Sequence, residues 1–131
     1  MGVTRFAAMS PSLCVLVVED EMLVAMMLEG MLRDLGHRVI KAARVAKAIG
    51  LAAAETIDFA ILDVNLAGEA SYQVAEELRR RDIPFVFASG YDPGSLRGDF
   101  HDIAVLRKPY LSHDVRQVVT NAIRSRGAAG P

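Results

Sequence analysis

Cysteine is almost absent from this chain: among its 131 residues only Cys14 is one, and it lies inside an apolar run. A single cysteine cannot form an internal disulfide, and apolar neighbours favour a buried structural thiol over a reactive one. Histidines with metal-ligand spacing are also lacking, because His37, His101 and His113 are scattered along the chain. We expect these histidines at the surface or at helix ends. The cysteine content is typical of a protein in a reducing cytoplasm.

An excess of charge and long apolar runs are lacking too. The 15 Lys and Arg residues are balanced by 16 Asp and Glu, and the net charge is -1. Because basic residues do not cluster in the sequence, neither nucleic acid nor a lipid surface is an expected partner. No apolar run reaches the roughly 18 residues of a membrane span, and the N-terminus lacks the pattern of a signal peptide. We therefore expect a soluble, unexported protein with no membrane insertion.

What the chain does contain is an alternation of short apolar runs with segments of helical spacing. The runs read as strands buried on both faces, which belong to parallel sheets. They cover residues 13–18, 38–42, 59–62, 85–88 and 104–106. Right-handed crossovers then predict an α/β fold, a flavodoxin-like doubly wound sandwich of five β-α units with strand order 2-1-3-4-5. The fourth helix should be short or irregular, because Pro93, Gly94 and Gly98 interrupt it.

The element boundaries follow from turn and cap residues. Gly36 should end the first helix, and Ser71 and Ser112 should cap the third and last helices. Residues 13–126 are expected to form one domain, with loosely ordered tails at residues 1–12 and 127–131. Apolar spacing in the first helix predicts that its methionines fill the core. These methionines are Met22, Met26, Met27 and Met31.

Polar residues follow the ends of four of the predicted strands. They are Glu19, Asp20, Asp63, Ser89 and Lys108. Ligands of open α/β sheets bind outside the carboxyl ends of the strands, so we expect these side chains to converge on one site. Acids, a hydroxyl and a lysine together indicate a site that binds a cation and handles phosphate.

The three carboxylates would repel one another, and either a proton or a divalent cation must relieve that repulsion. Oxygen ligands without a neighbouring histidine or cysteine favour a hard ion, Mg²⁺ or Mn²⁺. Asp20 and Asp63 are the expected direct ligands. The backbone carbonyl of Asn65 could add a third bond, and Glu19 could orient a metal-bound water.

Asp63 ends the central strand, where its carboxylate could attack phosphorus once a metal neutralises the incoming phosphoryl group. The metal, the Ser89 hydroxyl and the Lys108 ammonium would then each hold one equatorial oxygen. A cis Lys108-Pro109 bond would aim the lysine at the site, although the sequence leaves the isomer open.

Four segments in this order resemble the receiver domain of bacterial two-component response regulators. They are Val17-Val18-Glu19-Asp20-Glu21, Ile61-Leu62-Asp63-Val64-Asn65-Leu66, Ala88-Ser89-Gly90 and Lys108-Pro109-Tyr110. The resemblance implies that Asp63 takes a phosphoryl group from the phosphohistidine of a histidine kinase or phosphotransfer protein. It also implies that Asp20 and Asp63 bind Mg²⁺, and that Ser89 and Lys108 report phosphorylation. Any of the methionines Met22, Met26, Met27 and Met31 that are exposed could help to dock a kinase helix.

The chain departs from the common receiver pattern at Val105, where many receivers carry a switch aromatic. The segment from Pro84 to Asp92 instead resembles single-domain regulators with a Phe-Ala-Thr-Gly-aromatic motif, with Ser89 in place of the threonine. In that case Tyr91 would be the aromatic side chain that changes position when Ser89 moves on phosphorylation. The subfamily tends to have a poorly formed fourth helix, and it is associated with the stress and kinase networks of alphaproteobacteria.

The expected function is a stand-alone phosphoacceptor that signals by protein contact or acts as a phosphate sink or relay. It would be no enzyme beyond Mg²⁺-dependent self-phosphorylation and autodephosphorylation, and no attached effector is expected after the last helix. A haloacid-type phosphatase would need an acid where Asn65 stands. A flavodoxin-like nucleotide binder would need an anion loop where Glu19, Asp20 and Glu21 repel phosphate. A degenerate receiver that docks partners without phosphorylation is the alternative.

Overall fold

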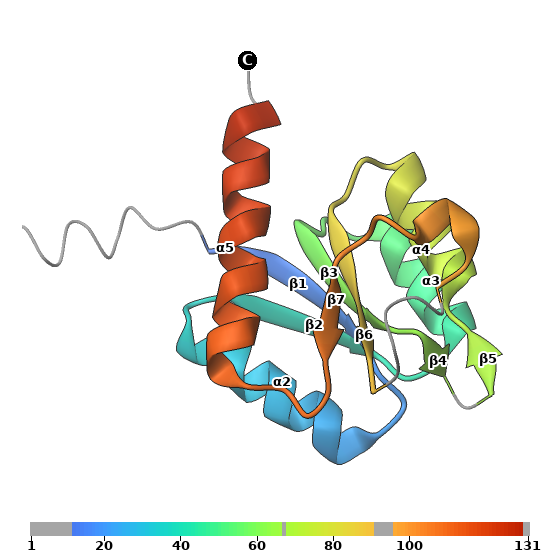
Figure 1. Cartoon of the computed structure of the whole chain (residues 1–131), viewed down its shortest axis with the longest axis horizontal. Helices are drawn as coiled ribbons and strands as arrows, with labels where there is room; N and C mark the ends of the chain where they lie inside the picture. The colour runs from blue at the N-terminus through green and yellow to red at the C-terminus, as the bar shows by residue number, and fades with distance from the viewer. Residues whose placement is uncertain (1–11, 67, 91–95, 130–131) are drawn as a thin grey trace, which may run out of the picture.

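A five-stranded parallel sheet forms the centre of the molecule (Figure 1). The computed structural model describes residues 12–66, 68–90 and 96–129. The sheet contains β1 (Cys14–Val18), β2 (Arg38–Ala42), β3 (Phe59–Asp63), β6 (Phe85–Ser89) and β7 (Val105–Arg107). Their order is β2-β1-β3-β6-β7, which confirms the predicted doubly wound fold and its strand order.

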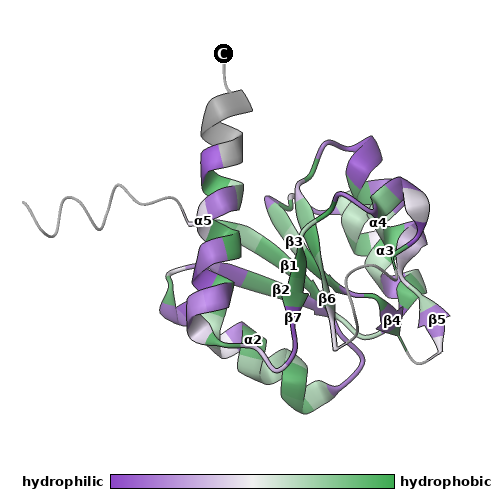
Figure 2. Ribbon diagram, viewed as in Figure 1, coloured by the Kyte–Doolittle hydropathy of each residue, from purple (hydrophilic) through white to green (hydrophobic). Residues whose placement is uncertain are grey.

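Helices cover both faces of the sheet (Figure 1). They are α2 (Met22–Asp34), α3 (Val45–Ala54), α4 (Tyr72–Arg80) and α5 (Ser112–Ala129). Leu28 of α2 and Val115 of α5 pack in one buried cluster with β1 and β3, whereas Ala48 of α3 and Leu78 of α4 pack in another. The strands between these layers are hydrophobic along their length (Figure 2), as expected for strands buried on both faces. Among the described residues, no helix is long and apolar enough to cross a bilayer.

The connection between β3 and α4 is itself ordered. After β3 the chain forms a small antiparallel hairpin of β4 (Asn65–Leu66) and β5 (Glu69–Ala70). Gly68, with φ of +88°, supplies the left-handed backbone that this turn needs.

The predicted weakness of the fourth helix agrees with the described part of its segment. Between residues 96 and 104 that part contains one 3₁₀ turn, η2 (Gly98–Phe100). Phe100 of this turn stacks on Tyr72 of α4 with ring centroids 5.6 Å apart, which holds the turn against the helix.

One predicted helix boundary is confirmed and others need correction. Gly36 follows the end of α2 as predicted, with φ of +93°. Ser71 precedes α4 as predicted, but its side chain makes no capping hydrogen bond. Ser112 is the first residue of α5 rather than the residue before it, and α5 continues to Ala129, beyond the predicted domain end. The N-terminal tail, except Ser12, and residues 130–131 lie outside the described residues.

The prediction that the methionines of the first helix fill the core is wrong for three of the four. Met22, Met26 and Met27 are 75%, 52% and 43% exposed. The helix is apolar on more than one side, and the side that turns inward carries Ala25, Leu28 and Leu32. His37 is also not a surface residue: it is buried, and its Nδ1 accepts a hydrogen bond of 3.0 Å from the backbone N–H of Leu13.

Candidate functional site

The predicted site residues converge because the register of the sheet aligns the carboxyl ends of its strands. Val18 of β1 pairs with Leu62 of β3, so Glu19 and Asp63 follow side by side. Asp63 in turn pairs with Ala88 of β6, the residue before Ser89. Ser89 pairs with Arg107 of β7, the residue before Lys108. One edge of the sheet therefore carries all four side chains.

The three carboxylates form a compact acidic cluster. Glu19, Asp20 and Asp63 each place a carboxylate oxygen so that the three atoms lie within 4.8 Å of one another. Glu19 and Asp63 are buried, with 3% and 8% of their surface exposed. Charges of one sign this close together and shielded from water repel strongly. A positive group must therefore be nearby.

Lys108 supplies the first positive charge. Its Nζ lies 2.8 Å from Asp63 Oδ2 and 2.8 Å from Glu19 Oε1. Its backbone N–H donates to the carbonyl of Ser89 at 3.1 Å, and its bond to Pro109 is cis. Burial alone lowers the pKa of Lys108, but the hydrogen bond to Asp63 and the contact with Glu19 outweigh burial and raise it. The lysine therefore stays charged at neutral pH.

Glu19 is the most constrained of the acids. Its Oε2 accepts a hydrogen bond of 3.1 Å from the backbone N–H of Glu21. Its buried Oε1 contacts Lys108 as an ion pair, yet it has no partner with hydrogen-bond geometry among the described residues. Burial raises the pKa of Glu19, and the negative charge of Asp63 adds to this effect. An oxygen so placed can accept a hydrogen bond from a further group, such as a metal-bound water.

The cluster suits a divalent cation. One lysine stands among three carboxylic side chains, so the cluster holds more acidic groups than basic ones. All donors are oxygen atoms, and such a set selects hard ions such as Mg²⁺ or Mn²⁺ over zinc or copper. Asp20 is the most exposed of the three acids and Asp63 lies beside it, so these two could bind the ion directly.

Three other predicted site residues are Asn65, Ser89 and Tyr91. The backbone N–H of Asn65 points to Asp63 Oδ1 at 3.4 Å, and the Asn65 side chain accepts the N–H of Gly68. Ser89 is buried at the end of β6. Tyr91, the predicted moving aromatic, lies outside the described residues.

Tyr110 is a site residue that the sequence reasoning did not select. It is buried, and the carboxylates of Glu19 and Asp63 lie close enough to act on its hydroxyl. Burial raises the pKa of Tyr110, and the charges of Glu19 and Asp63 raise it further, so the hydroxyl stays protonated. The sequence held one sign of this role. Tyr110 follows the Lys108-Pro109 pair directly, at a position where a phenylalanine would have filled the same space without a hydroxyl.

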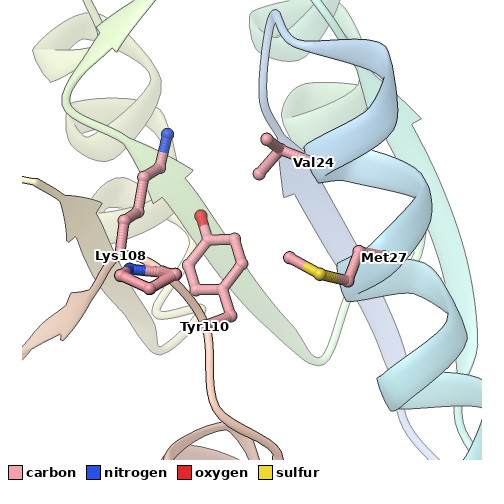
Figure 3. A pocket seen from close by; sticks show the side chains of 5 residues that line it. Val24, Met27, Lys108 and Tyr110 are labelled. Atoms are coloured by element: carbon pink, nitrogen blue, oxygen red, sulfur yellow. The ribbon is translucent and has the colours of Figure 1, made fainter.

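A pocket of about 310 Å³ opens beside the acidic cluster, between α2 and the segment that follows β7 (Figure 3). Val24 and Met27 of α2 face Tyr110 across it, and Pro109 also lines the pocket. Exposed apolar side chains adjoin these lining residues in the sequence, namely Met22, Leu23, Met26 and Leu111. Together, the pocket and these four side chains form an apolar surface next to Lys108, called the α2 surface below.

Comparison with known proteins agrees with this geometry. The model of the response regulator receiver domain family matches residues 15–124. The chain is 33% identical over 114 residues to the phyllosphere-induced regulator PhyR of Methylorubrum extorquens, which covers 83% of this chain and 43% of PhyR. It spans less than half the length of the curated relatives that it matches.

Solved structures show the same likeness. The solution structure of SdrG from Sphingomonas melonis Fr1 is 44% identical, with a TM-score of 0.77 over 88% of this chain and 99% of SdrG. The receiver domain of the sensor histidine kinase PA1611 from Pseudomonas aeruginosa PAO1 has a similar fold. It is 24% identical, with a TM-score of 0.72 over 86% of this chain and 98% of that domain, and it holds a magnesium ion in its active-site cleft.

Proposed function

Because the chain belongs to the family of response regulator receiver domains, we propose that it accepts a phosphoryl group on Asp63 from the phosphohistidine of a histidine kinase or phosphotransfer protein. The phosphorylated chain then signals through protein contacts or passes the phosphate on as a sink or relay. The observation that carries this proposal is the ion pair of 2.8 Å between Lys108 and Asp63 within the acidic cluster. It joins an acceptor carboxylate and a phosphate-binding cation at one edge of the sheet.

In the proposed transfer, a carboxylate oxygen of Asp63 forms a bond to phosphorus while the bond from phosphorus to the donor imidazole nitrogen breaks. The bonding electron pair leaves with the imidazole. A bound divalent ion would offset the negative charge of the incoming group. Lys108 then moves from the carboxylate to a phosphoryl oxygen, and the buried Ser89 hydroxyl donates to another. Both residues change partners, so the phosphate can bias the conformation of the β6 and β7 ends.

The readout surface would lie on the β7 side of the sheet. A groove of about 260 Å³ runs between β7 and α5 there, lined by Val105 and Arg107 on one wall and Asp114 and Gln117 on the other. Arg107 directly precedes Lys108 and pairs with Ser89, so movement of either switch residue reaches this groove.

The donor protein would approach over the α2 surface. Leu23 and Met22 are 79% and 75% exposed at the start of α2, which follows the acidic Glu19 and Asp20. Burial of large, exposed apolar side chains against an apolar partner helix is favourable, because it releases the water that covers them. A kinase or phosphotransfer protein seated there would have its phosphohistidine near Asp63.

Two further expectations belong to this proposal. The chain has no catalytic activity beyond its own Mg²⁺-dependent phosphorylation and dephosphorylation, and it acts in the cytoplasm, where the buried free thiol of Cys14 stays reduced. A receiver that docks partners without phosphorylation is the competing function. The two differ in whether Asp63 reacts.

The test is intact-mass measurement after incubation with phosphoramidate, with and without Mg²⁺, for the wild type and Asp63→Asn. The proposal expects one added phosphoryl group that requires Mg²⁺ and is absent in the variant. Asp34→Asn, at the far end of α2, is the matched control and should be phosphorylated like the wild type. No added mass in the folded wild type would favour the docking function instead.

A further inference from the structure

Methionine is concentrated on one helix of this chain. Four of its six methionines lie within α2. Three of the four are exposed, namely Met22, Met26 and Met27, at 75%, 52% and 43%. The fourth, Met31, is half-buried and packs against the apolar core. Three thioether sulfurs of α2 are therefore on side chains open to dissolved molecules, while a fourth on the same helix is partly covered.

An exposed methionine differs from an exposed leucine in its chemistry more than in its packing. The two side chains have similar volumes, but the thioether sulfur of methionine can be oxidised to a sulfoxide. The same face of α2 also carries Leu23, which is 79% exposed, so an apolar surface here does not require sulfur. A sulfoxide is polar, and oxidation would turn an apolar surface into one that holds its water.

The cysteine of this chain is poorly placed for oxidation. Cys14 is 4% exposed within β1, and burial raises the pKa of its thiol. Oxidants react with the thiolate form and need access to the sulfur, so burial and a raised pKa both protect Cys14. Oxidation of the folded chain should therefore begin at the exposed methionines of α2.

We propose that Met22, Met26 and Met27 form an oxidation site, and that their sulfoxides block docking of the phosphate donor. Hydrogen peroxide is the oxidant. A sulfur lone pair forms a bond to one peroxide oxygen, the O–O bond breaks, and its electron pair leaves with the other oxygen, which takes the proton of the first and departs as water. The thioether is oxidised and the peroxide is reduced. A methionine sulfoxide reductase reverses the step with electrons from a thiol.

The position of these methionines connects the modification to the acidic cluster. Met22 opens α2 two residues after Asp20. Met27 lines the pocket shared with Lys108 and Tyr110, and its side chain extends from α2 toward Tyr110 (Figure 3). The inference rests on the proposed function, because it takes the α2 surface as the place where the donor protein docks. None of the three methionines belongs to the acidic cluster, so the oxidised chain should still react with a small donor.

The first measurement is the rate of oxidation at each methionine. The full-length wild type is treated with hydrogen peroxide, samples are quenched with catalase, and peptide mass spectrometry counts the added oxygen. We expect Met22 and Met26 to oxidise about tenfold faster than Met31, because oxidation follows exposure. Equal rates at Met22, Met26 and Met31 in the folded protein would overturn the assignment of the site.

The second measurement compares two phosphate donors before and after oxidation. Transfer from a histidine kinase that phosphorylates the untreated wild type should fall by about tenfold or more, as expected when central apolar contacts are lost. Phosphorylation by phosphoramidate should change by less than about twofold. Treatment with methionine sulfoxide reductases should restore transfer from the kinase. This recovery needs no substitution in the chain.

A matched pair of variants identifies the sulfurs responsible. The triple variant Met22→Leu, Met26→Leu, Met27→Leu keeps the apolar volume and removes the three sulfurs, whereas Met31→Leu keeps them. Each variant is compared with itself before and after peroxide, so any effect of the substitution alone cancels. Transfer to the triple variant should not change on oxidation, and transfer to Met31→Leu should fall as in the wild type.

The outcomes separate this inference from the proposed function. Unchanged transfer to the oxidised wild type, or a loss of transfer in the oxidised triple variant, would overturn the inference and leave phosphorylation of Asp63 intact. An equal loss with both donors would place the damage in the acidic cluster and would also overturn it. A wild type that takes phosphate from neither donor would overturn both proposals.

Discussion

Lys108 and Asp63, which are 45 residues apart in the chain, are joined by a hydrogen-bonded ion pair of 2.8 Å between Nζ and Oδ2. The lysine also contacts Glu19, so a single cation compensates two buried carboxylates before any phosphate arrives. The sequence left open whether a proton or a divalent cation relieves the repulsion between the acids, and the lysine supplies part of that relief. A cation is already present, and the remaining charge suits a divalent ion.

Replacing this lysine should therefore separate metal binding from phosphorylation. In Lys108→Met the cluster keeps its carboxylates and loses its cation, so Mg²⁺ should bind more tightly, by about tenfold. Phosphorylation by phosphoramidate should slow by about 100-fold or more, because a charge that stabilises the transition state is gone. Isothermal titration with Mg²⁺ and phosphorylation time courses measure the two effects. Lys47→Met on the exposed side of α3 is the control, and weaker Mg²⁺ binding in Lys108→Met would contradict the account.

The α2 surface should matter to a protein donor and not to a small one. Leu23→Ser combined with Met26→Ser should leave phosphorylation by phosphoramidate unchanged. Transfer from a histidine kinase that phosphorylates the wild type should fall by about tenfold or more, as expected when central apolar contacts are lost. The matched control replaces Ala46 and Ala53 by serine on the exposed side of α3. An equal loss with both donors would instead place the defect in the site.

Ser71 offers a test of packing. It is fully buried, and its Oγ has no hydrogen-bond partner among the described residues. Ser71→Ala should raise the free energy of unfolding by about 1 kcal/mol, because an unsatisfied buried hydroxyl is removed. Ser12→Ala is the counterpart, since the Ser12 hydroxyl donates to the Gly36 carbonyl at 2.8 Å and its loss should not stabilise the fold. Urea unfolding of both variants measures the difference, and a destabilised Ser71→Ala would show that the hydroxyl is bonded.

His37 should make stability depend on pH. Burial lowers the pKa of His37 below the ordinary value of 6.5. In the folded chain, Nδ1 of His37 accepts the N–H of Leu13. A lowered pKa in the folded state means that the unfolded chain binds the proton more readily. The contribution of His37 is therefore complete above the unfolded pKa and is lost as pH falls through the folded value.

This dependence can be isolated with His37→Asn, whose side-chain oxygen can still accept from Leu13. Urea midpoints are compared from about pH 8 to about pH 5, the range in which an ordinary histidine titrates. The wild type should lose more stability than the variant as pH falls, while the carboxylates titrate in both. Parallel profiles would mean that His37 is already protonated in the folded chain or does not titrate in this range.

Periodicity and turn chemistry predicted most of the fold because the strands are short, apolar and separated by strong breakers. The β3 strand shows this well: its apolar run ends in Asp63, and the structure ends it there too. The face of α2 could not be predicted in the same way, because Met22, Met26 and Met27 continue the apolar pattern around the helix. Burial depends on which side meets the sheet, and composition alone does not contain that information.

The site residues that directly follow strands could be predicted from the sequence. Those that are brought in by tertiary contacts could not. Glu19, Asp63 and Lys108 follow apolar runs, so their convergence follows from parallel pairing. Tyr110 is brought into the electrostatic field of Glu19 and Asp63 by the path of the chain after β7, which no local pattern specifies. His37 likewise became buried because its ring meets the backbone of Leu13, 24 residues earlier.

The central claim is that Asp63 itself carries the phosphoryl group. Sodium borohydride reduces an aspartyl phosphate to homoserine, so treatment of the phosphorylated wild type, followed by digestion and mass spectrometry, locates the acceptor. The account predicts homoserine at position 63, formed only after phosphorylation in the presence of Mg²⁺. Homoserine at position 20, or reduction at no residue of a protein that has gained phosphate, would contradict it.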